Sequence, residues 1–311
     1  MPQIIKLDRH VLIDLFCGIG GVSCGFSQFG FEVVLAMDTW EQALRVHTIK
    51  YPKALHSSMQ LGTSEAEQFI FDVIAGLGLS DGDHLHVHAS PPCHLISSVN
   101  LAGTRNPNAG MVLVEWSFKL LDKIKRTTQN NVHVTWTIEE VNHPLIRQFC
   151  VSNNISFNVY NTSEYGVCQK RKRLVMTSID ITETMKTKCS YPCKSIEDIV
   201  ELPEATKYIS NFVYGPNRKP SAFKVSFIEI VPKKTVAYTV VQSSGWFLGE
   251  NKRPLRSFSW HDNMLLQSFP NDYINMDMKI KRIDLFKMIA NAVPPNFAKC
   301  LAKAIVIKSG L

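Results

Sequence analysis

The sequence contains no apolar stretch long enough to cross a bilayer, which excludes a membrane-spanning helix. Its first segment, MPQIIKLDRHVLIDL, lacks the apolar core of a secretory signal peptide before the first charged residues. We therefore expect an intracellular protein, cytoplasmic or nuclear, with reduced cysteines. The eight cysteines do not have the spacing of four Cys and His ligands that a structural zinc site requires, so this class is excluded too. Internal repeats and low-complexity tracts are also absent from the sequence.

The composition is that of a folded globular protein, with 45% hydrophobic and 20% charged residues in a chain of 311. This length accommodates one large domain, or a large domain that carries a smaller one. Lys and Arg outnumber Asp and Glu by 34 to 27, which gives a formal net charge of +7. The excess modestly favours an anionic partner such as nucleic acid.

The first half of the chain alternates short β-rich runs with segments of helical length, the pattern of an α/β parallel sheet. The predicted strands are 11–16, 31–38, 84–90 and 132–141, and the clearest crossover helix is 111–127. Ligands of such sheets bind beyond the carboxyl ends of the strands. We therefore look for functional residues directly after each strand.

Beyond about Ile179 the pattern loosens into short runs broken by Pro, Gly and Asn, and basic residues cluster there. These are Arg218, Lys219, Lys224, Lys233, Lys234, Lys252, Arg253 and Arg256. Apolar character returns in SWHDNMLLQSFPNDY and in the strongly helical segment 287–307. We expect a catalytic domain in 1–179, a small inserted domain in 180–254, and a return to the catalytic domain in 255–311.

The turn after the first strand, DLFCGIGG, is rich in glycine, which lets the main chain approach a bound cofactor closely. On its own such a turn is equally well explained as a tight connection from strand to helix. The second strand, however, ends in Asp38, and an acidic residue in that place can accept hydrogen bonds from ribose hydroxyls. Together the two features indicate a cofactor that contains a nucleoside.

Cys93 follows Pro91 and Pro92 in the loop after the third strand. The two prolines restrict the backbone, which would hold a nucleophilic thiol in place. A buried cysteine that packs as a small apolar residue is the alternative, and a catalytic thiol needs partners.

Glu139 ends the fourth strand, and the basic segment QKRKR lies at 169–173. Such a segment is usually a solvated face or a phosphate contact. If a strand begins here, however, Gln169, Arg171 and Arg173 share one side of it. Two inward arginines require anions, whether protein carboxylates, a phosphate or a polarised carbonyl.

In order and spacing these segments resemble the motifs of the C5-cytosine-specific DNA methyltransferase family. The matching segments are DLFCGIGG, AMDTWEQAL, SPPC, IEEV, EYGVCQKRKRL, LLQSFPNDY and IANAVPP. The resemblance covers most of 10–178 and 255–306. It implies a doubly wound, mostly parallel α/β fold of the Rossmann-like methyltransferase type, with a small recognition domain in the place of 180–254.

The resemblance also implies a chemistry in which S-adenosylmethionine donates a methyl group to C5 of a flipped-out cytosine. Cys93 would add to C6 of the base, which makes C5 nucleophilic. Glu139 would bond or protonate N3, and Arg173 would contact the base carbonyl or a phosphate. Arg171 would orient the acid and the nucleophile, and a base such as water would then remove the C5 proton.

By the same resemblance, Asp38 would bind the cofactor ribose, Trp40 would stack on adenine, and Asn291 and Val293 would close the methionine end. The full set of expected cofactor residues is Phe16, Gly18, Gly20, Asp38, Trp40, Pro92, Asn291 and Val293. The expected nucleic-acid contacts are Ser97, Arg105 and Gln169, the first two in a mobile loop that closes over the flipped base. The substrate and partner would be double-stranded DNA, with the protein as a monomer; the sequence identifies no restriction partner.

Four positions depart from the family pattern. Glu140 replaces an Asn, His94 a Gln and Ala290 a Gly, and no Asp stands in HSSMQ at 56–60, where adenine contacts are expected. An extra carboxylate at 140 could raise the pKa of Glu139 by like-charge repulsion.

Two alternative functions therefore stay open. One is methylation of cytosine in transfer RNA, which a branch of the family performs with the same catalytic set. The other is a DNA-binding or regulatory relative without turnover, which Glu140 and the missing Asp support. Binding of S-adenosylmethionine would separate this relative from either enzyme.

His84, His86 and His88 alternate and so share one face of a strand. Three histidines on one face raise the hypothesis of a metal site. A polar strand face is the commoner reason for such a pattern, and we expect no metal.

Overall fold

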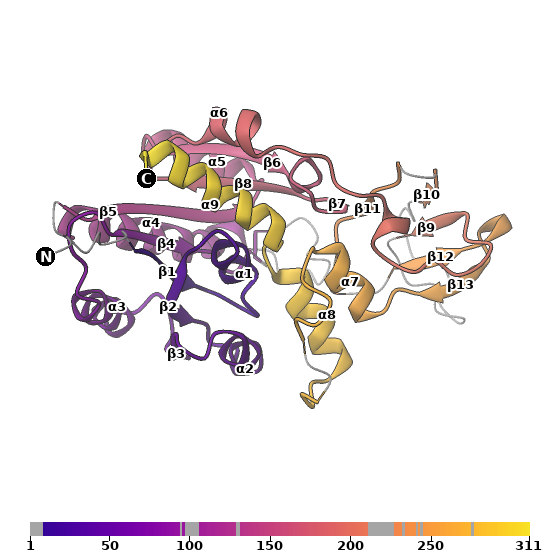
Figure 1. Ribbon diagram of the computed structural model, residues 1–311, viewed down its shortest axis with the longest axis horizontal. Helices are drawn as coiled ribbons and strands as arrows, with labels where there is room; N and C mark the ends of the chain where they lie inside the picture. Colours follow the sequence, from indigo (N-terminus) through magenta and orange to yellow (C-terminus); the bar gives the residue numbers. More distant parts are fainter. Residues whose placement is uncertain are drawn as a thin grey trace, which may run out of the picture. The chain divides into compact units, whose positions relative to one another are not determined.

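The computed structural model describes residues 9–93, 95–96, 106–128, 131–210, 227–231, 234–240, 242, 245–274 and 277–311. The chain divides into two compact units. Unit 1 comprises Met1–Tyr160, Arg173–Cys189 and Ala298–Leu311. Unit 2 comprises Asn161–Lys172 and Ser190–Phe297. Figure 1 labels the helices and strands of both units.

Unit 1 is built on a seven-stranded sheet with the strand order β3-β2-β1-β4-β5-β8-β6. The strands are β1 (His10–Leu15), β2 (Glu32–Met37), β3 (Leu55–Ser57), β4 (His84–Ala89), β5 (His133–Val141), β6 (Ser156–Asn161) and β8 (Lys172–Thr177). The pairings from β3 through to β5 are parallel, and β8 runs antiparallel to β5. The strand order reverses between β1 and β4, which makes this the switch point where ligands of doubly wound sheets bind. The predicted fold class is confirmed.

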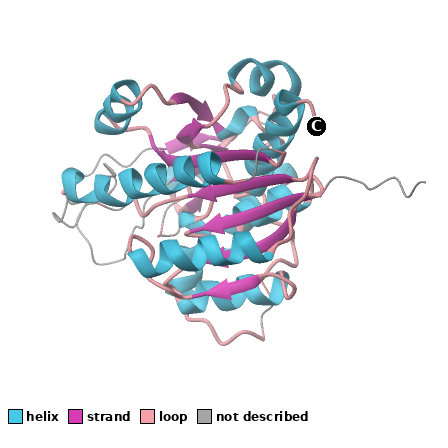
Figure 2. Cartoon of the chain, turned by 90° about the vertical axis from the view of Figure 1, so that its left-hand side faces the viewer, coloured by secondary structure: helices cyan, strands magenta, loops and turns pink. Residues whose placement is uncertain are grey.

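Helices cover the sheet of unit 1 and lie in front of and behind its strands in Figure 2. They are α1 (Gly21–Ser27), α2 (Glu41–Lys50), α3 (Ser64–Gly76), α4 (Pro107–Thr127), α5 (Pro144–Ser152), the short α6 (Thr182–Thr184) and most of α9 (Pro295–Ser309). A π-helical turn, η2 (Met185–Cys189), follows α6. All four strands predicted from the sequence are present. The predicted helix 111–127 begins earlier, at Pro107, because Asn106 caps it through the Ala109 amide.

The core of unit 1 explains why these segments are strands. β1 is buried along nearly its whole length, and β4 is buried completely, as expected for central parallel strands. Val11, Ile13, Leu85 and Val87 belong to the main apolar core. The alternate positions of β4 are histidines, so one face of the central strand is polar even though it is fully buried.

Unit 2 contains a four-stranded antiparallel sheet with the order β10-β9-β12-β13. Its strands are β9 (Tyr208–Ser210), β10 (Phe227–Glu229), β12 (Trp246–Leu248) and β13 (Pro254–Ser257), and a separate pair joins β7 (Gln169–Lys170) to β11 (Ala237–Tyr238). Its helices are α7 (Trp260–Leu266) and α8 (Arg282–Asn291), and its 3-10 turns are η1 (Thr162–Glu164), η3 (Ile196–Asp198) and η4 (Glu250–Lys252).

The strongly helical segment 287–307 is divided between α8 and α9. The break follows from Pro294 and Pro295, because proline lacks an amide donor and pushes the preceding residue out of the helical region. Unit 2 also includes 161–172 and 255–297, which the sequence analysis assigned to the catalytic domain. Division by packing does not test which residues recognise a substrate, so the predicted domain boundaries stay a prediction.

Candidate active site

The turn after β1 has the conformation of a close-approach loop. Gly18 and Gly20 have φ of 53° and 90°, and Phe16 has φ of 59°. A left-handed conformation is rare and strained for a bulky residue such as Phe16, and strain of this kind concentrates at functional sites. A Cβ added to Gly18 would meet no atom within 4 Å, so its glycine serves the backbone conformation and leaves open space beside the turn.

Asp38 ties this turn to the start of α2. Its Oδ2 accepts a hydrogen bond from the Gly18 amide at 2.8 Å, and its Oδ1 accepts one from the Trp40 amide at 2.8 Å. Burial raises the pKa of Asp38, and the two amide hydrogen bonds oppose that shift. The carboxylate is thus oriented from both sides, while each oxygen retains a lone pair for a ligand hydroxyl.

Cys93 lies in the loop that continues β4 past Ser90. The Ser90 amide donates to the Leu15 carbonyl, and the Ile96 amide donates to the Cys93 carbonyl. Pro91 is buried and Cys93 is partly exposed. All eight cysteines lie in the described part of the chain, and none forms a disulfide. Six others are buried, so the packing role suits them better than it suits Cys93.

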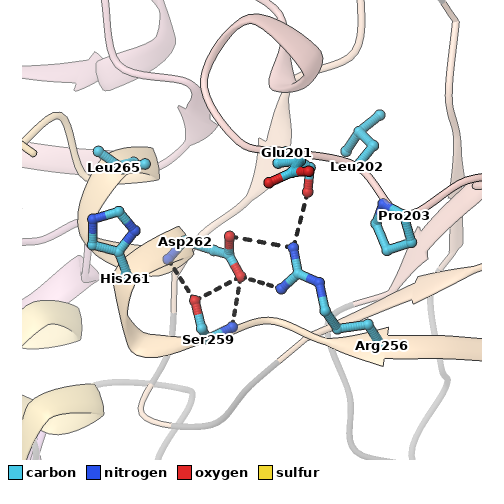
Figure 3. A pocket seen from close by; sticks show the side chains of 8 residues that line it. All are labelled: Glu201, Leu202, Pro203, Arg256, Ser259, His261, Asp262 and Leu265. Atoms are coloured by element: carbon cyan, nitrogen blue, oxygen red, sulfur yellow. Dashed lines mark hydrogen bonds and ion pairs between the residues drawn. The ribbon is translucent and has the colours of Figure 1, made fainter.

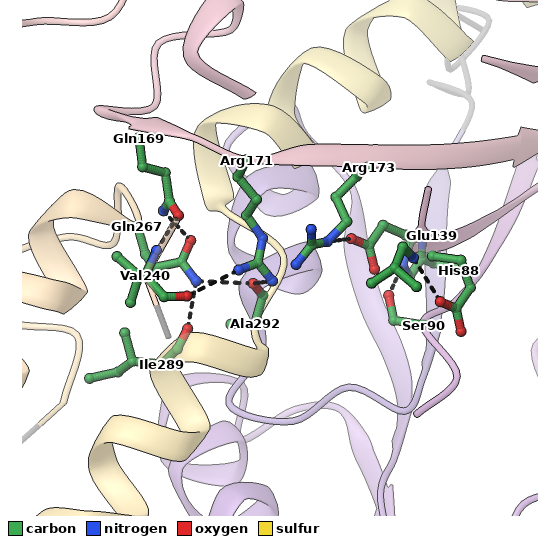
Figure 4. Close-up of polar contacts among 12 residues, drawn as sticks. His88, Ser90, Glu139, Gln169, Arg171, Arg173, Val240, Gln267, Ile289 and Ala292 are labelled. Atoms are coloured by element: carbon green, nitrogen blue, oxygen red, sulfur yellow. Dashed lines mark hydrogen bonds and ion pairs between the residues drawn. The ribbon is translucent and has the colours of Figure 1, made fainter. Parts of the chain in front are cut away.

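Glu139 forms an ion pair with Arg173. The Arg173 Nε lies 2.8 Å from the Glu139 Oε1, and both side chains are largely buried, with 13% and 10% exposure (Figure 4). The pairing of β5 with β8, in which Val141 lies opposite Arg173, brings the two groups together. The arginine that forms an ion pair with Glu139 is thus Arg173, and the role of Arg171 in orienting the acid stays a prediction.

Glu140 is buried, and its Oε2 accepts a hydrogen bond from the Val141 amide at 2.7 Å. Burial, and then the neighbouring Glu139, raise the pKa of Glu140 to about 8. The side chain is therefore mostly protonated at neutral pH. A protonated carboxyl offers one donor and acceptor capacity, much as an amide does. A neutral Glu140 side chain therefore adds no second negative charge beside Glu139 at the position where the family pattern has asparagine.

Gln169 and Arg171 share the predicted inward side, since both are buried while Lys170 between them is exposed. The Gln169 side chain donates to Gln267 at 2.6 Å and accepts from the Val240 amide at 2.9 Å (Figure 4). These hydrogen bonds would have to open before Gln169 could contact a nucleic acid. In this structure it organises the interior of unit 2, and its predicted nucleic-acid contact stays a prediction.

The Arg171 guanidinium lies 3.5 Å from the Val240 carbonyl and 3.4 Å from the Ala292 carbonyl. Ala292 follows α8 directly, and Gln267 donates to the same carbonyl at 3.3 Å. Inward arginines are predicted to contact a carboxylate, a phosphate or a polarised carbonyl. In the structure, two main-chain carbonyls supply such contacts to Arg171. Sequence reasoning did not identify Gln267, which has no signal beyond its place in LLQSFPNDY.

Asn291 and Val293 flank Ala292. Asn291 is exposed and accepts a hydrogen bond from the Gln242 side chain at 3.0 Å, while Val293 is buried. Both belong to unit 2. Their assignment to the cofactor rests on the family resemblance and stays a prediction. Ser97, Arg105 and His94 lie outside the described residues.

A pocket of about 570 Å³ lies in unit 2 at the start of α7 (Figure 3). Its lining residues are Glu201, Leu202, Pro203, Arg256, Ser259, His261, Asp262 and Leu265. Arg256 donates to the Asp262 carboxylate at 2.5 Å and to the Glu201 carbonyl at 2.9 Å. The charges of Arg256 and Asp262 therefore compensate each other within unit 2. The Arg256 guanidinium is fixed by the Asp262 carboxylate and the Glu201 carbonyl.

The metal hypothesis finds no support among the residues that the structure describes, where no group of three or more His, Cys, Asp and Glu side chains could hold an ion. The histidines of β4 bond instead to hydroxyls of β5. In the same part of the chain, no helix has the length and apolar character to span a membrane.

The fold and the order of these site segments are those of a methyltransferase of the doubly wound class. The chain belongs to the C-5 cytosine-specific DNA methylase family, whose model matches residues 11–115 and 151–307. The predicted family and enzyme class are thereby confirmed. The interval between the two matched stretches contains β5 with Glu139 and the unusual Glu140.

Relatives of similar length support this assignment. The type II methyltransferase M.HindV of Haemophilus influenzae is 24% identical over 94% of this chain and 95% of its own. M.HgiDI of Herpetosiphon aurantiacus is 24% identical over 94% and 93%. Among solved structures, the Entamoeba histolytica methyltransferase EhMeth has a TM-score of 0.67 at 14% identity, with 97% of this chain and 99% of that chain covered. The S. pombe Dnmt2 methyltransferase has a TM-score of 0.63 at 15% identity, with the same coverage. At these identities the structures support the fold alone.

Proposed function

We propose that the protein transfers a methyl group from S-adenosylmethionine to C5 of cytosine in double-stranded DNA, through a covalent bond between Cys93 and C6. The observation that carries the proposal is the arrangement at the carboxyl edge of the sheet of unit 1. β4 and β5 are parallel neighbours, with Ala89 opposite Ile138. The loop with Cys93 therefore leaves the sheet at the edge where the acid Glu139 lies near the end of β5.

The steps follow from the residues at this edge. The Cys93 thiolate forms a bond to C6, and the electron pair of the C5–C6 double bond becomes available at C5. Glu139 hydrogen-bonds the N3 edge and stabilises charge that develops there, while Arg173 holds its carboxylate in place. After C5 has taken the methyl group, a base removes the C5 proton. The electron pair of the C5–H bond restores the C5–C6 double bond, and the electron pair of the C6–S bond returns to the Cys93 sulfur.

S-adenosylmethionine supplies the methyl group when bound, and the family consists of enzymes that depend on it. The residues of unit 1 fit this cofactor. The left-handed turn of Phe16, Gly18 and Gly20 leaves open space, and the Asp38 carboxylate is oriented to accept hydrogen bonds from a ribose diol. Trp40 and Pro92 are assigned to the same site by the resemblance.

DNA as the substrate is supported by the family and by the net charge of +7. The C5 and C6 atoms of a paired and stacked base cannot be reached by a thiol and a cofactor together, so the cytosine must be flipped out of the helix. Transfer RNA is the competing substrate, and the test includes it.

The experiment measures methyl transfer from labelled S-adenosylmethionine to unmethylated genomic DNA and to total RNA, followed by bisulfite sequencing of the DNA. We expect label in DNA at one sequence context with the natural protein and none with Cys93→Ala. Cys193→Ala, a partly exposed cysteine of unit 2, is the matched control and should retain activity. Label in RNA alone would transfer the assignment to transfer-RNA methylation. Bound cofactor without any label would favour the non-enzymatic alternative.

A further inference from the structure

A continuous chain of hydrogen bonds runs along the central strands of unit 1. From one end to the other it passes through His10, His84, Thr135, His86, Thr137, His88 and Ser90. The successive distances between the bonded atoms are 3.2, 2.7, 2.8, 3.0, 2.7 and 2.7 Å. The histidines come from β1 and β4 and the threonines from β5, so the chain crosses back and forth between neighbouring strands.

The interior of this hydrogen-bonded chain is buried, whereas its two ends are partly exposed to solvent. His84, His86, His88 and Thr137 are fully buried, and Thr135 is 4% exposed. His10 and Ser90 are both partly exposed. From His84 to Ser90 the strand advances by about 20 Å, at roughly 3.3 Å per residue. The chain therefore connects two accessible ends of the sheet through its interior.

All hydrogen bonds of this series of side chains can be donated in the same direction, with every donor and acceptor satisfied. A neutral imidazole has one donor and one acceptor nitrogen, and each hydroxyl can donate once and accept. Each buried histidine uses Nδ1 toward one partner and Nε2 toward the other. If His10 donates to His84, every later group can donate toward Ser90, and if Ser90 donates to His88, every bond can point toward His10.

Burial keeps the three histidines of β4 neutral. Burial, followed by the neighbours His10 and His133, lowers the pKa of His84 to about 3. Burial likewise lowers the pKa of His88 to about 3, and it lowers the pKa of His86 well below its ordinary value. A chain of neutral groups with two opposite polarities can pass a proton by reversing every bond, without a lasting charge inside.

The accessible end beyond β4 adjoins the proposed active site. Ala89 lies opposite Ile138, so the next pair in the register is Ser90 with Glu139. Ser90 follows His88 by two residues and Glu139 follows Thr137 by two, and side chains two apart share a face. Figure 4 draws Ser90, His88 and Glu139 at this edge. The chain thus ends at the hydroxyl beside the predicted acid, three residues before Cys93.

Other groups also face this hydrogen-bonded chain, and His133 of β5 lies opposite His84 in the register. On β1, Asp14 lies opposite His88 in the register, and its carboxylate accepts hydrogen bonds from Ser23. Phe26 stacks on His86 with ring centroids 4.8 Å apart, and Phe31 meets His84 edge-on. These aromatic rings cover the imidazoles, which explains their exclusion from water.

We propose that the chain from Ser90 to His10 is a proton path that carries the C5 proton away from the active site. The proposal rests on the proposed function, because that reaction releases one proton in each turnover. The Ser90 oxygen takes up the proton, directly or through water, as its own proton passes to the His88 Nε2. Each group then hands on the proton it held, and His10 receives one on Nδ1 and returns one to solvent. One proton enters and one leaves, and the reversed chain is reset when rings and hydroxyls turn.

The test removes single hydroxyls without changing side-chain shape. Thr135→Val breaks the chain far from the active site and Thr137→Val breaks it nearer, whereas Thr135→Ser preserves the hydroxyl. Thr177→Val is the matched control, because Thr177 is a buried threonine of β8 whose hydroxyl donates to the Ile179 carbonyl outside the chain. Thermal unfolding of each variant establishes that it is folded and shows the cost of the lost hydroxyl.

Two rates are measured in single turnovers on DNA with tritium at cytosine C5: methyl transfer and tritium release. We expect Thr135→Val and Thr137→Val to transfer the methyl group as Thr177→Val does. Tritium release should slow by about tenfold or more, since positioned proton transfer is typically worth a hundredfold and water can replace part of the path. The covalent adduct of protein and DNA should accumulate accordingly, and Thr135→Ser should release tritium at the natural rate.

The outcomes separate the two proposals. If the natural protein transfers no methyl group, the proposed function fails and the path fails with it. If the natural protein is active and Thr135→Val releases tritium as fast as Thr177→Val, the path is overturned and the proposed function stands. The buried chain would then serve only to satisfy polar groups inside the sheet.

Discussion

The Arg173 guanidinium lies 2.8 Å from the Glu139 carboxylate, across the antiparallel pair of β8 and β5. A planar guanidinium holds a carboxylate in a fixed orientation, and the low exposure of both groups strengthens the contact. This ion pair positions the acid of the proposed reaction at the edge of the sheet from which Cys93 also emerges.

Replacement of Arg173 should therefore impair the chemical step more than binding. We expect Arg173→Ala to lower kcat by about a hundredfold, in line with the loss of one preorganised electrostatic partner, and Arg173→Lys to recover part of it. Steady-state kinetics with S-adenosylmethionine and DNA measure the effect. Lys172→Ala, at the exposed neighbouring position, is the control. An equal loss in both variants would indicate a general role of charge in DNA binding.

The raised pKa of Glu140 predicts that the free energy of unfolding depends on pH. With a pKa of about 8 in the folded protein and 4.5 as the ordinary value, the folded state holds a proton that the unfolded state has lost between these limits. Stability contributed by Glu140 is therefore full below about pH 4.5 and falls as the pH rises toward 8.

Glu140→Gln removes this dependence, because the amide stays neutral at every pH. We expect the variant to gain a few kcal/mol in free energy of unfolding over the natural protein between pH 5 and pH 8. Urea unfolding at several pH values gives the two slopes. Parallel stability curves for the two proteins would show that Glu140 is ionised in the folded state. Glu140→Asn, which restores the family residue, should be compared for activity.

The cofactor assignment of Asp38 is tested by calorimetric titration with S-adenosylmethionine. Asp38→Ala removes the acceptor of the Gly18 and Trp40 amides and the proposed ribose contact together. We expect affinity to fall by about tenfold or more, the equivalent of a charge-assisted hydrogen bond. Glu41→Gln, an exposed carboxylate at the start of α2, should bind normally. Unchanged affinity in Asp38→Ala would remove Asp38 from the site.

Gln169 separates a structural role from the predicted contact with DNA. Gln169→Leu removes the hydrogen-bond partner of the Val240 amide and that of the Gln267 Oε1, at a cost of about 1–3 kcal/mol for each buried group left unsatisfied. We expect a clear loss of thermal stability, whereas Lys170→Ala should leave stability unchanged. Weakened DNA binding by Gln169→Leu at full stability would restore the predicted contact.

The sequence predicted those parts of the fold whose causes are local. The strands around Leu12 and Val33 are apolar runs with turns at their ends, and the strand around Val87 alternates apolar residues with histidines. The alternation of 169–173 gives one buried and one exposed side. Pro294 and Pro295 mark the break between α8 and α9 within a segment whose pattern is otherwise helical.

Other features arise from partners distant in the chain. Which of Arg171 and Arg173 contacts Glu139 depends on which of them lies next to β5, and no spacing in 169–173 encodes that. The alternate histidines of β4 had a visible pattern, but its meaning depends on Thr135 and Thr137. Those threonines alternate in the same way on the neighbouring strand, and only the register of β4 with β5 joins the two patterns. Pairing of alternate His with alternate Thr is the signal that could have revealed the chain.

The central claim is that Cys93 attacks C6 of cytosine, and the most direct measurement is covalent trapping on DNA that contains 5-fluorocytosine. Fluorine cannot leave C5 as a proton does, so the bond between Cys93 and C6 persists after methyl transfer. In the presence of S-adenosylmethionine we expect an adduct that survives denaturing electrophoresis and whose mass spectrum places the nucleotide on Cys93. Cys193→Ala should form it and Cys93→Ala should not. An active protein that forms no adduct, or one whose adduct persists in Cys93→Ala, would contradict the account.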